Sequence, residues 1–350
     1  MVVALDFRAM GAREDELIAF GECFERNGTG RQLVALRWQY LENPTRELFV
    51  DLAISQGRIA AIYAVQPAFV RVRDAPVLAA QSVDTLVDAD FRGRGLFTQM
   101  AEAVYGRVAE HHGAFVYGFP NAKSAPGFFN KLGWLSLDPV PFLVRPLRTA
   151  FIASKLPFGR WLRRLPDFRV PIGGSRLQST QVLRPMTEFG ADLDELWKRF
   201  ASDVGVAVDR SAAYLRWRLT KPGVRYESLG LFEGDQLIGF CAYTTVDKHG
   251  GRIGYVIELL HDPGHSEVGG ALLAECLQRM ASDGADAVLA WCFPHSPNAD
   301  AYSATGFLPL PERLRPIELH VGVRPLAESL TDVLSDRRNW YISYCDSDTV

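Results

Sequence analysis

Hydrophobic residues recur along the first part of the chain with two different periods, and these periods predict its elements. Residues 16–26 repeat apolar positions with helical spacing, which predicts an amphipathic helix. Residues 48–52 and 59–65 alternate instead, as strands do, and the turn residues Ser55-Gln56-Gly57 between them predict a hairpin. A further apolar strand is expected over residues 79–87.

A glycine-rich turn follows this strand and opens a predicted helix over residues 96–112. Four of the apolar side chains in this helix, Leu96, Met100, Val104 and Val108, fall on one face. Similar patterns predict more strands and helices in both halves of the chain. The expected ranges are strand 114–119, helix 124–131, strand 254–260, helix 270–282 and strand 287–293.

Four short segments of the first half recur in the same order in the second half, at offsets of 173 to 179 residues. The pairs are Phe7-Arg8-Ala9-Met10 with Leu183-Arg184-Pro185-Met186, Leu36-Arg37-Trp38 with Leu215-Arg216-Trp217, Leu132-Gly133-Trp134 with Thr305-Gly306-Phe307, and Val144-Arg145-Pro146-Leu147 with Val323-Arg324-Pro325-Leu326. One such match would be chance, whereas four collinear matches indicate a duplicated domain of about 145 residues.

The repeat divides the chain into four parts. The copies cover residues 1–147 and 181–326, a basic and aromatic linker covers 148–180, and a C-terminal tail covers 327–350. In each copy hairpin strands come first, and strand, helix, strand and helix follow. This order predicts an α/β (α+β) fold of two tandem domains, each a layered sheet with helices packed on it.

Composition narrows the possible partners. The 350 residues are 48% hydrophobic and 23% charged, which excludes disordered, collagen-like and low-complexity proteins. The formal net charge is −3, so no global field attracts nucleic acid or an anionic membrane. The five cysteines are far apart and form no zinc-spaced cluster with histidine, which predicts reduced thiols and no metal site. No signal-peptide pattern and no apolar run of about 18 residues occurs, so the cytoplasm is the expected compartment.

The linker is the exception to this neutral surface, because residues 148–176 carry six arginines and one lysine among aromatic and aliphatic residues. One interpretation is a peripheral contact with a membrane surface or an anionic substrate. The other is a connecting helix whose apolar side is buried between the two domains. We favour the second interpretation, because most apolar faces in folded proteins are buried.

The most informative segment for chemistry is the turn Arg92-Gly93-Arg94-Gly95, between the strand over residues 79–87 and the helix that opens at Leu96. Glycines allow successive backbone N–H groups to point into one concavity, and the positive end of the helix dipole lies at the same place. The two arginines add positive charge. The turn therefore predicts a phosphate site, although glycine turns also precede many helices for steric reasons alone.

In its context this turn resembles the coenzyme A loop of the GNAT superfamily of acyl-CoA-dependent N-acyltransferases. The family sequence R-x-x-G-x-G/A corresponds to residues 92–97, with Phe97 in place of the last small residue. Downstream, the family's second motif places an Asn at the end of a strand and closes the next helix on a Gly-aromatic pair, which is similar to residues 121–134. The resemblance covers both copies and implies, for each, a mixed, mostly antiparallel central sheet flanked by helices. It also implies acetyl-CoA or another acyl-CoA as co-substrate.

The resemblance implies that coenzyme A binds in the first domain, and that a backbone N–H near Leu86 or Val87 binds the thioester oxygen. The implied coenzyme A contacts are Leu86, Val87, Arg92, Gly93, Arg94, Gly95, Leu96, Phe97, Asn121, Ser124 and Phe129. In the second copy the aligned loop, residues 265–270, lacks the arginines and carries Glu267, whose carboxylate would repel phosphate. We expect a degenerate second domain that supports the first or shapes the acceptor site.

Acyl transfer to an amine needs a base, because the amine must be neutral, and the departing thiolate benefits from an acid. Asp84, on the strand before the loop, is the candidate base; the alternative is a solvent-facing or ion-paired aspartate. The family's acid is a tyrosine at the position of Phe129, and the second copy has Tyr302 there. Tyr117 and Ser124 are candidate substitutes, with roles as a strand aromatic and a helix N-cap as the alternatives.

Two further groups have a structural and a catalytic interpretation. The tail residues 339–350 are aromatic and then acidic, and some tandem relatives bring such a tail into the active site, whereas a frayed terminus is the commoner case. His111 and His112 lie at the end of a predicted helix, where we expect exposed cap residues rather than catalysts.

The leading hypothesis is therefore an N-acyltransferase, with acetyl as the expected acyl group, that acts on an amine of a small molecule or sugar held between the two domains. One alternative is a non-catalytic acyl-CoA-binding or scaffold protein, which Phe129 favours. Another is a Fem-like aminoacyl transferase, which the basic linker favours and the glycine loop opposes. Nucleic acid is not an expected partner of the leading candidate.

Overall fold

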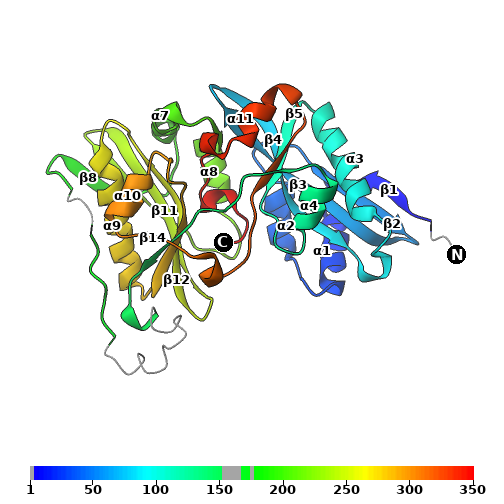
Figure 1. Cartoon of the computed structure of the whole chain (residues 1–350), viewed down its shortest axis with the longest axis horizontal. Coiled ribbons are helices and arrows are strands. Elements are labelled where there is room, and N and C mark those ends of the chain that lie inside the picture. The colour runs from blue at the N-terminus through cyan, green and yellow to red at the C-terminus, as the bar shows by residue number, and fades with distance from the viewer. Residues whose placement is uncertain (1–3, 152–166, 174–176) are drawn as a thin grey trace.

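Two sheets lie side by side, each flanked by helices, and the C-terminal end of the chain lies between them (Figure 1). The computed structural model describes residues 4–151, 167–173 and 177–350. Its mixed α/β architecture with two helix-flanked sheets confirms the predicted fold class.

The first sheet has the order β1-β2-β3-β4-β5-β15-β6, and β9 pairs with β3. Helices α1 and α2 cover one face, where Phe20 and Leu36 are buried, and α3 and α4 cover the other, where Met100 and Phe128 are buried. The bounds are β1 Asp6–Ala9, α1 Glu14–Arg26, α2 Leu33–Tyr40, β2 Phe49–Ser55, β3 Arg58–Val72, β4 Ala75–Val87, α3 Leu96–Glu110, β5 Gly113–Gly118, α4 Ala125–Lys131, β6 Leu135–Ser136, β9 Val206–Val208 and β15 Gly322–Pro325.

The second sheet has the order β14-β7-β13-β12-β11-β10-β8. Helix α9 packs on β11 and β12 through buried residues such as Leu272 and Met280. Helix α7 packs on the same two strands, and its buried residues belong to a different apolar cluster. The bounds are β7 Phe142–Pro146, β8 Gln181–Pro185, α7 Ala191–Phe200, α8 Ala212–Arg218, β10 Glu227–Glu233, β11 Gln236–Lys248, β12 Gly251–His261, α9 Ser266–Ser282, β13 Ala287–Trp291, α10 Ala299–Ala304, β14 Leu308–Pro309 and, beside the tail, α11 Thr331–Ser335.

The two halves exchange their last strands. Strand β7 is the last strand of the first half in sequence but pairs with β13 of the second sheet, and β15 of the second half pairs with β5 of the first sheet. These are the strands that carry the Val-Arg-Pro-Leu repeat, so each copy completes the sheet of the other. The predicted boundaries at residues 147 and 326 consequently do not separate two independent sheets.

Most predicted elements are present with longer bounds. The predicted hairpin is formed by β2 and β3, and the turn between them places Gln56 and Gly57 at φ values of 51° and 77°. The face of α3 predicted to be apolar is buried. The predicted helix start at residue 270 is wrong, because α9 already begins at Ser266, so most of the expected second loop is its first turn.

Both central strands bulge and diverge at equivalent positions. The pairing of β3 with β4 shifts register between Tyr63 and Val65, and the pairing of β11 with β12 shifts between Ala242 and Tyr243. Parallel pairing ends at Ser82 with Gly118 in the first sheet and at Tyr255 with Leu289 in the second. Ser82 and Tyr255 are 173 residues apart, one of the offsets of the sequence repeat.

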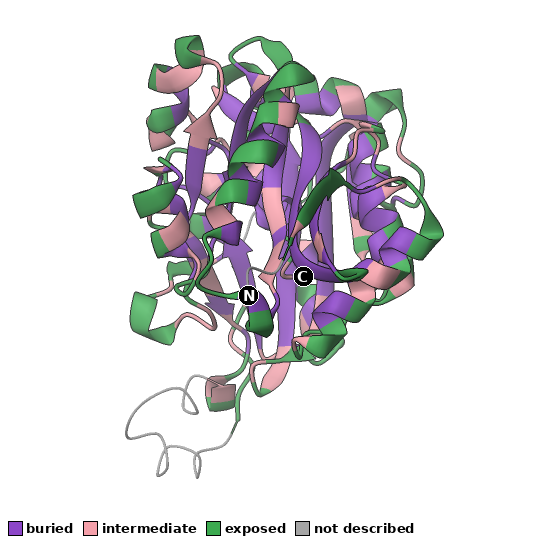
Figure 2. Cartoon of the chain, turned by 90° about the vertical axis from the view of Figure 1, so that its right-hand side faces the viewer, coloured by how far each residue is buried: buried purple, intermediate pink, exposed green. Residues whose placement is uncertain are grey.

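The core joins the halves rather than filling each separately. Figure 2 shows buried residues concentrated in the strands, with exposed residues on the outer faces of the helices. The largest apolar cluster includes Phe115 of β5, Trp291 of β13 and Trp340 of the tail. The expectation of a frayed tail is wrong, because Trp340 to Ser347 are buried in that cluster or beside it.

Three other expectations concern the linker, the thiols and the membrane. The Arg148 side chain forms an ion pair with Asp167, and its backbone forms an isolated antiparallel β-bridge with Arg169. Most of the expected connecting helix lies outside the described residues. All five cysteines are free and buried. Over the described ranges, no helix has both the length and the apolar character needed to cross a bilayer, and no cluster of His, Cys, Asp and Glu could hold a metal ion.

Candidate active site

The divergence of β4 from β5 opens a cavity of about 780 Å³ in the first half. Parallel pairing ends at Ser82 and Gly118, while β4 continues for five more residues to Val87. One wall is this free part of β4, and the other is formed by residues 118–134, including the start of α4. The volume lies within the range of about 300–1,000 Å³ that is typical of small-molecule sites.

The free part of β4 offers backbone hydrogen-bonding groups to this cavity. The Asp88 N–H donates to Ala60 O of β3 at 3.0 Å, and the Val87 carbonyl oxygen instead accepts from Arg92 Nε at 3.2 Å. Because backbone groups alternate along a strand, Thr85 and Val87 point to the open side and Leu86 points to β3. Of the two expected donors to the thioester oxygen, Val87 therefore has the suitable orientation and Leu86 does not.

The glycine turn stands at one end of this cavity. Gly93 and Gly95 have φ values of 79° and 76°, and no described atom lies within 4 Å of a Cβ built on either residue. Gly95 is the N-cap of the 15-residue helix α3, and the exposed side chains of Arg92 and Arg94 flank the turn. The open, left-handed backbone, the helix dipole and the arginines fit the pyrophosphate of an acyl-CoA.

The unusual residue of the turn, Phe97, is accommodated by a glycine on the facing helix. The Phe97 ring lines the cavity and packs edge-on against Phe128 of α4, with ring centroids 5.3 Å apart. A Cβ built on Gly127 would lie 2.8 Å from Phe97 Cε1. The family pattern has a small residue at position 97. The larger Phe97 ring fits here because the facing residue, Gly127, has no side chain.

Two more expected contacts line the same cavity at the start of α4. The Asn121 side-chain oxygen accepts from the backbone N–H groups of Lys123 and Ser124 at 3.0 and 3.1 Å, which fixes the turn before the helix. Ser124 occupies the N-cap position, but its hydroxyl donates back to Asn121 O at 3.2 Å instead of capping the helix. The Ser124 hydroxyl is therefore a polar group at the cavity wall.

The other expected site residues lie elsewhere. Tyr117 is buried between Phe115 and Trp340, and burial raises the pKa of its phenol well above the usual value. Phe129 packs beside His320 and against Gly322 of β15. Neither residue lines the cavity between β4 and β5, in which the described residues include no tyrosine. The equivalent Tyr302 is fully buried in the second half.

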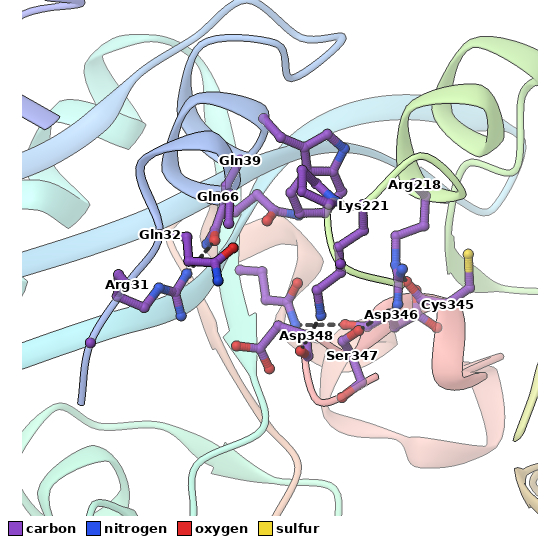
Figure 3. A pocket seen from close by; sticks show the side chains of 16 residues that line it. Arg31, Gln32, Gln39, Gln66, Arg218, Lys221, Cys345, Asp346, Ser347 and Asp348 are labelled. Atoms are coloured by element: carbon purple, nitrogen blue, oxygen red, sulfur yellow. Dashed lines mark hydrogen bonds between the residues drawn. The ribbon is translucent and has the colours of Figure 1, made fainter. Parts of the chain in front are cut away.

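A second cavity, of about 330 Å³, lies between the halves (Figure 3). Its walls come from the segment after α1, from α2, from the middle of β3 and β4, from the loop after α8, and from the tail. The labelled polar side chains in Figure 3 include Arg31, Gln66, Lys221 and Asp348, so the cavity is strongly polar. Residues widely separated in sequence therefore meet in one site.

Asp84, the candidate base, is buried at the edge of this second cavity and does not line it directly. Its Oδ2 accepts a hydrogen bond from the Tyr40 hydroxyl at 2.7 Å and pairs with Arg31 at 2.9 Å. No described residue donates to its Oδ1. Burial raises the pKa of the Asp84 carboxyl, while Arg31 and the Tyr40 hydrogen bond oppose that rise.

The tail closes the far side of this cavity through a buried charge network. Arg210 pairs with Glu258 of β12 and with Asp346 of the tail, at 2.5 and 2.7 Å, and all three side chains are almost fully buried. The Asp346 carbonyl oxygen accepts from Gln81 of β4 at 2.6 Å. The tail is thus bonded to both sheets.

The two cavities are lined by successive residues of β4. Gln81 lines the cavity between the halves, and the next residue, Ser82, lines the cavity between β4 and β5. The bulge that follows, at Val83 and Asp84, turns the strand at this place. A ligand in each cavity would approach the other across one short segment of β4.

The equivalent opening of the second sheet is filled by side chains. Asn298 donates to Leu259 O at 2.8 Å, and the Tyr341 hydroxyl is bonded to Glu258 and to Asn298. The His261 ring lies against the first turn of α9, since a Cβ on Gly269 would be 2.6 Å from it. The space that an acyl-CoA would need is therefore occupied.

The sequence analysis missed the polar residues of the inter-half cavity. Gln66 and Gln81 interrupt apolar stretches of β3 and β4, which is the one sequence signal that could have identified them. Arg31, Tyr40 and Lys221 stand in segments with no comparable pattern. Only the folded arrangement places them near Asp84 and the tail.

Comparison with known proteins agrees with this geometry. Residues 12–136 match the family described as acetyltransferase (GNAT) domain. No curated protein matches the chain.

The chain also resembles solved structures along most of its length. It aligns with a GCN5-related N-acetyltransferase from Anabaena variabilis at 11% identity and TM-score 0.64, over 95% of this chain and 75% of that one. It aligns with Saccharomyces cerevisiae N-myristoyltransferase with bound myristoyl-CoA at 12% identity and TM-score 0.58, over 92% and 79%. An Enterococcus faecalis probable N-acyltransferase aligns at 11% and TM-score 0.60, over 93% and 73%. At these identities the likeness shows a shared tandem fold.

Proposed function

Because residues 12–136 match an acetyltransferase (GNAT) domain and the chain has the tandem GNAT-like fold, we propose that it is an acyl-CoA-dependent N-acyltransferase, with acetyl as the expected acyl group. The acyl-CoA would occupy the cavity between β4 and β5, and the acceptor, a small molecule or sugar that carries an amine, would occupy the cavity between the halves. The observation that carries this proposal is that two successive residues of β4, Gln81 and Ser82, line the two cavities.

The arrangement supplies the groups that the reaction needs. The pyrophosphate would bind at the turn of Gly93 and Gly95, and the Val87 N–H would donate to the thioester oxygen, where negative charge develops during attack. Asp84 Oδ1 would take the proton from the acceptor ammonium through water, because Asp84 does not itself line the cavity. The neutral amine then attacks the thioester carbon, and the C–S bond breaks. The proton that the nitrogen loses as the amide forms passes to the departing thiolate through the Ser124 hydroxyl or through water.

The experiment is a transfer assay with acetyl-CoA and longer acyl-CoAs against a mixture of small amines. Release of the CoA thiol and the mass of the acylated amine are followed together. The proposal requires both, in equal amounts, with one preferred acyl length. Thiol release without an acylated amine would mean that the acceptor has not been included, and a wider set of amines would follow.

A second candidate function is non-catalytic binding of acyl-CoA. It is favoured by the placement of Tyr117 and Phe129, since among the described residues of the cavity no tyrosine can protonate the thiolate. Binding of acyl-CoA with neither hydrolysis nor transfer would support this candidate. A Phe129→Tyr change is a poor test of it, because that side chain packs against Gly322.

A further inference from the structure

Two buried glutamines form the floor of the cavity between the halves. Gln66 of β3 and Gln81 of β4 are direct cross-strand partners, so their side chains leave the same face of the sheet. Only 8% of Gln66 and 5% of Gln81 is exposed. Both side chains line the cavity, and Gln66 is labelled there in Figure 3. A ligand in this cavity would rest on two primary amides.

These amides have unused hydrogen-bonding capacity. The Gln66 side chain makes no hydrogen bond with any described residue. Gln81 donates from Nε2 to Asp346 O at 2.6 Å, and within the described ranges nothing donates to its side-chain oxygen. Buried polar groups are normally satisfied, so water or a ligand must supply the missing partners. The floor offers both donors and acceptors to that partner.

The cations of the cavity, in contrast, are already engaged. Arg31 is bonded to Asp84 and Gln39. Arg218 donates to backbone carbonyl oxygens of the tail, and Lys221 donates to the carbonyl oxygens of Asp348 and Val350. A ligand carboxylate would therefore meet occupied donors and the exposed Asp348. The cavity favours an acceptor that is uncharged apart from its amine.

An apolar amine would also fit poorly, because it would cover the two glutamines without satisfying them. A hydroxyl group differs from both, since it donates to one amide oxygen and accepts from the other amide. On the basis of the proposed function, we infer that Gln66 and Gln81 select acceptors whose amine lies next to hydroxyl groups, as in an amino sugar or an amino alcohol. Hydroxyls on this floor place the amine beside the β4 bulge and Asp84.

The test is calorimetric binding of three amines to the whole protein in the presence of coenzyme A. Glucosamine carries hydroxyls, cyclohexylamine has a comparable ring without them, and glycine carries a carboxylate. Glucosamine should bind roughly 10- to 100-fold more tightly than either of the others. Equal or tighter binding of cyclohexylamine or glycine overturns the inference, as does binding of none of the three.

A matched pair of variants locates the selectivity. Gln66→Met keeps the side-chain size and removes the amide, so the preference for glucosamine should fall to about threefold or less. Gln278→Met changes an exposed glutamine of α9 and should leave the preference unchanged. A preference that survives Gln66→Met contradicts the inference. Failure of the proposed function is seen separately, as absence of acetyl-CoA binding or transfer, whereas these titrations need no turnover.

Discussion

Trp38 and Trp217 stack face to face across the junction of the two halves, with ring centroids 4.6 Å apart and an interplanar angle of 9°. Each indole N–H donates to the backbone carbonyl oxygen of the other tryptophan at 2.9 Å. The two residues occupy equivalent places in the repeated Leu-Arg-Trp segments. The two copies of the repeated segment thus contact each other reciprocally through these tryptophans. Trp38 also lines the cavity between the halves.

This contact should be a major source of stability. Trp38→Ala and Trp217→Ala should each lower the free energy of unfolding by about 3–5 kcal/mol. The double variant should lose less than the sum, because each single change already removes the shared stacking and hydrogen bonds. Denaturant unfolding of the four proteins measures this coupling. Strict additivity would show that the two rings do not stabilise each other.

The strand exchange makes each half dependent on the other. Residues 1–150 alone lack β15, which pairs with β5, and residues 167–350 alone lack β7, which pairs with β13. Each fragment leaves a central strand of its sheet without its partner, so we expect that neither fragment unfolds cooperatively on its own. A mixture of the two fragments should regain the cooperative transition. Circular dichroism during heating provides the measurement. A cooperative transition in either isolated fragment would contradict this prediction.

The position of the Phe97 ring should require a glycine at position 127. Gly127→Ala places a methyl carbon only 2.8 Å from Phe97 Cε1, and such overpacking costs about 1–3 kcal/mol. Phe97→Ala removes the obstacle, so the double variant should be more stable than the sum of the single losses predicts. Thermal unfolding of the series gives the answer. An unaffected Gly127→Ala protein would mean that the ring moves aside at no cost.

Asp84 should set the acidic limb of the pH profile. Burial raises the pKa of this carboxyl above its usual value, and only the ionised form can accept a proton, so kcat/KM should fall as pH decreases through that raised pKa. Asp84→Asn should abolish the limb and lower kcat/KM by roughly 10²- to 10⁴-fold.

A matched control is Asp51→Asn, because burial raises the pKa of Asp51 as well and its partner is Arg107, away from both cavities. The acidic limb should persist in this variant. If it persists in Asp84→Asn too, another group is the base.

Local patterns in the sequence were sufficient for much of the fold and for one part of the site. Alternation and helical spacing predicted β4, α3 and β5 in order. The glycine turn between β4 and α3 was also visible in the sequence, and Arg92 and Phe97 at its two ends line the cavity between β4 and β5. The repeat of Val144 to Leu147 in Val323 to Leu326 was visible, but a repeat does not tell which sheet a strand joins. Pairing between residues so far apart depends on the whole fold.

The cavity between the halves was not predictable for the same reason. Asp84 was chosen as the candidate base from its place on the strand, whereas its partners Arg31 and Tyr40 come from segments that only the fold brings to it. Phe129 has the expected place in the sequence motif, yet the exchanged strand β15 supplies the Gly322 against which it packs. Tyr117 is covered by Trp340 of the tail.

Calorimetric titration of acetyl-CoA tests the central claim, that the glycine turn and the β4/β5 cavity hold the acyl donor. The unmodified protein should bind one molecule per chain. Gly95→Glu should weaken binding at least about 100-fold, because it puts a side chain and a carboxylate where the pyrophosphate would lie. Gly250→Glu is the control, since Gly250 has nearly the same φ and the same open space in the turn between β11 and β12 of the second sheet. Equal affinity in Gly95→Glu and Gly250→Glu, or no binding by the unmodified protein, would contradict the account.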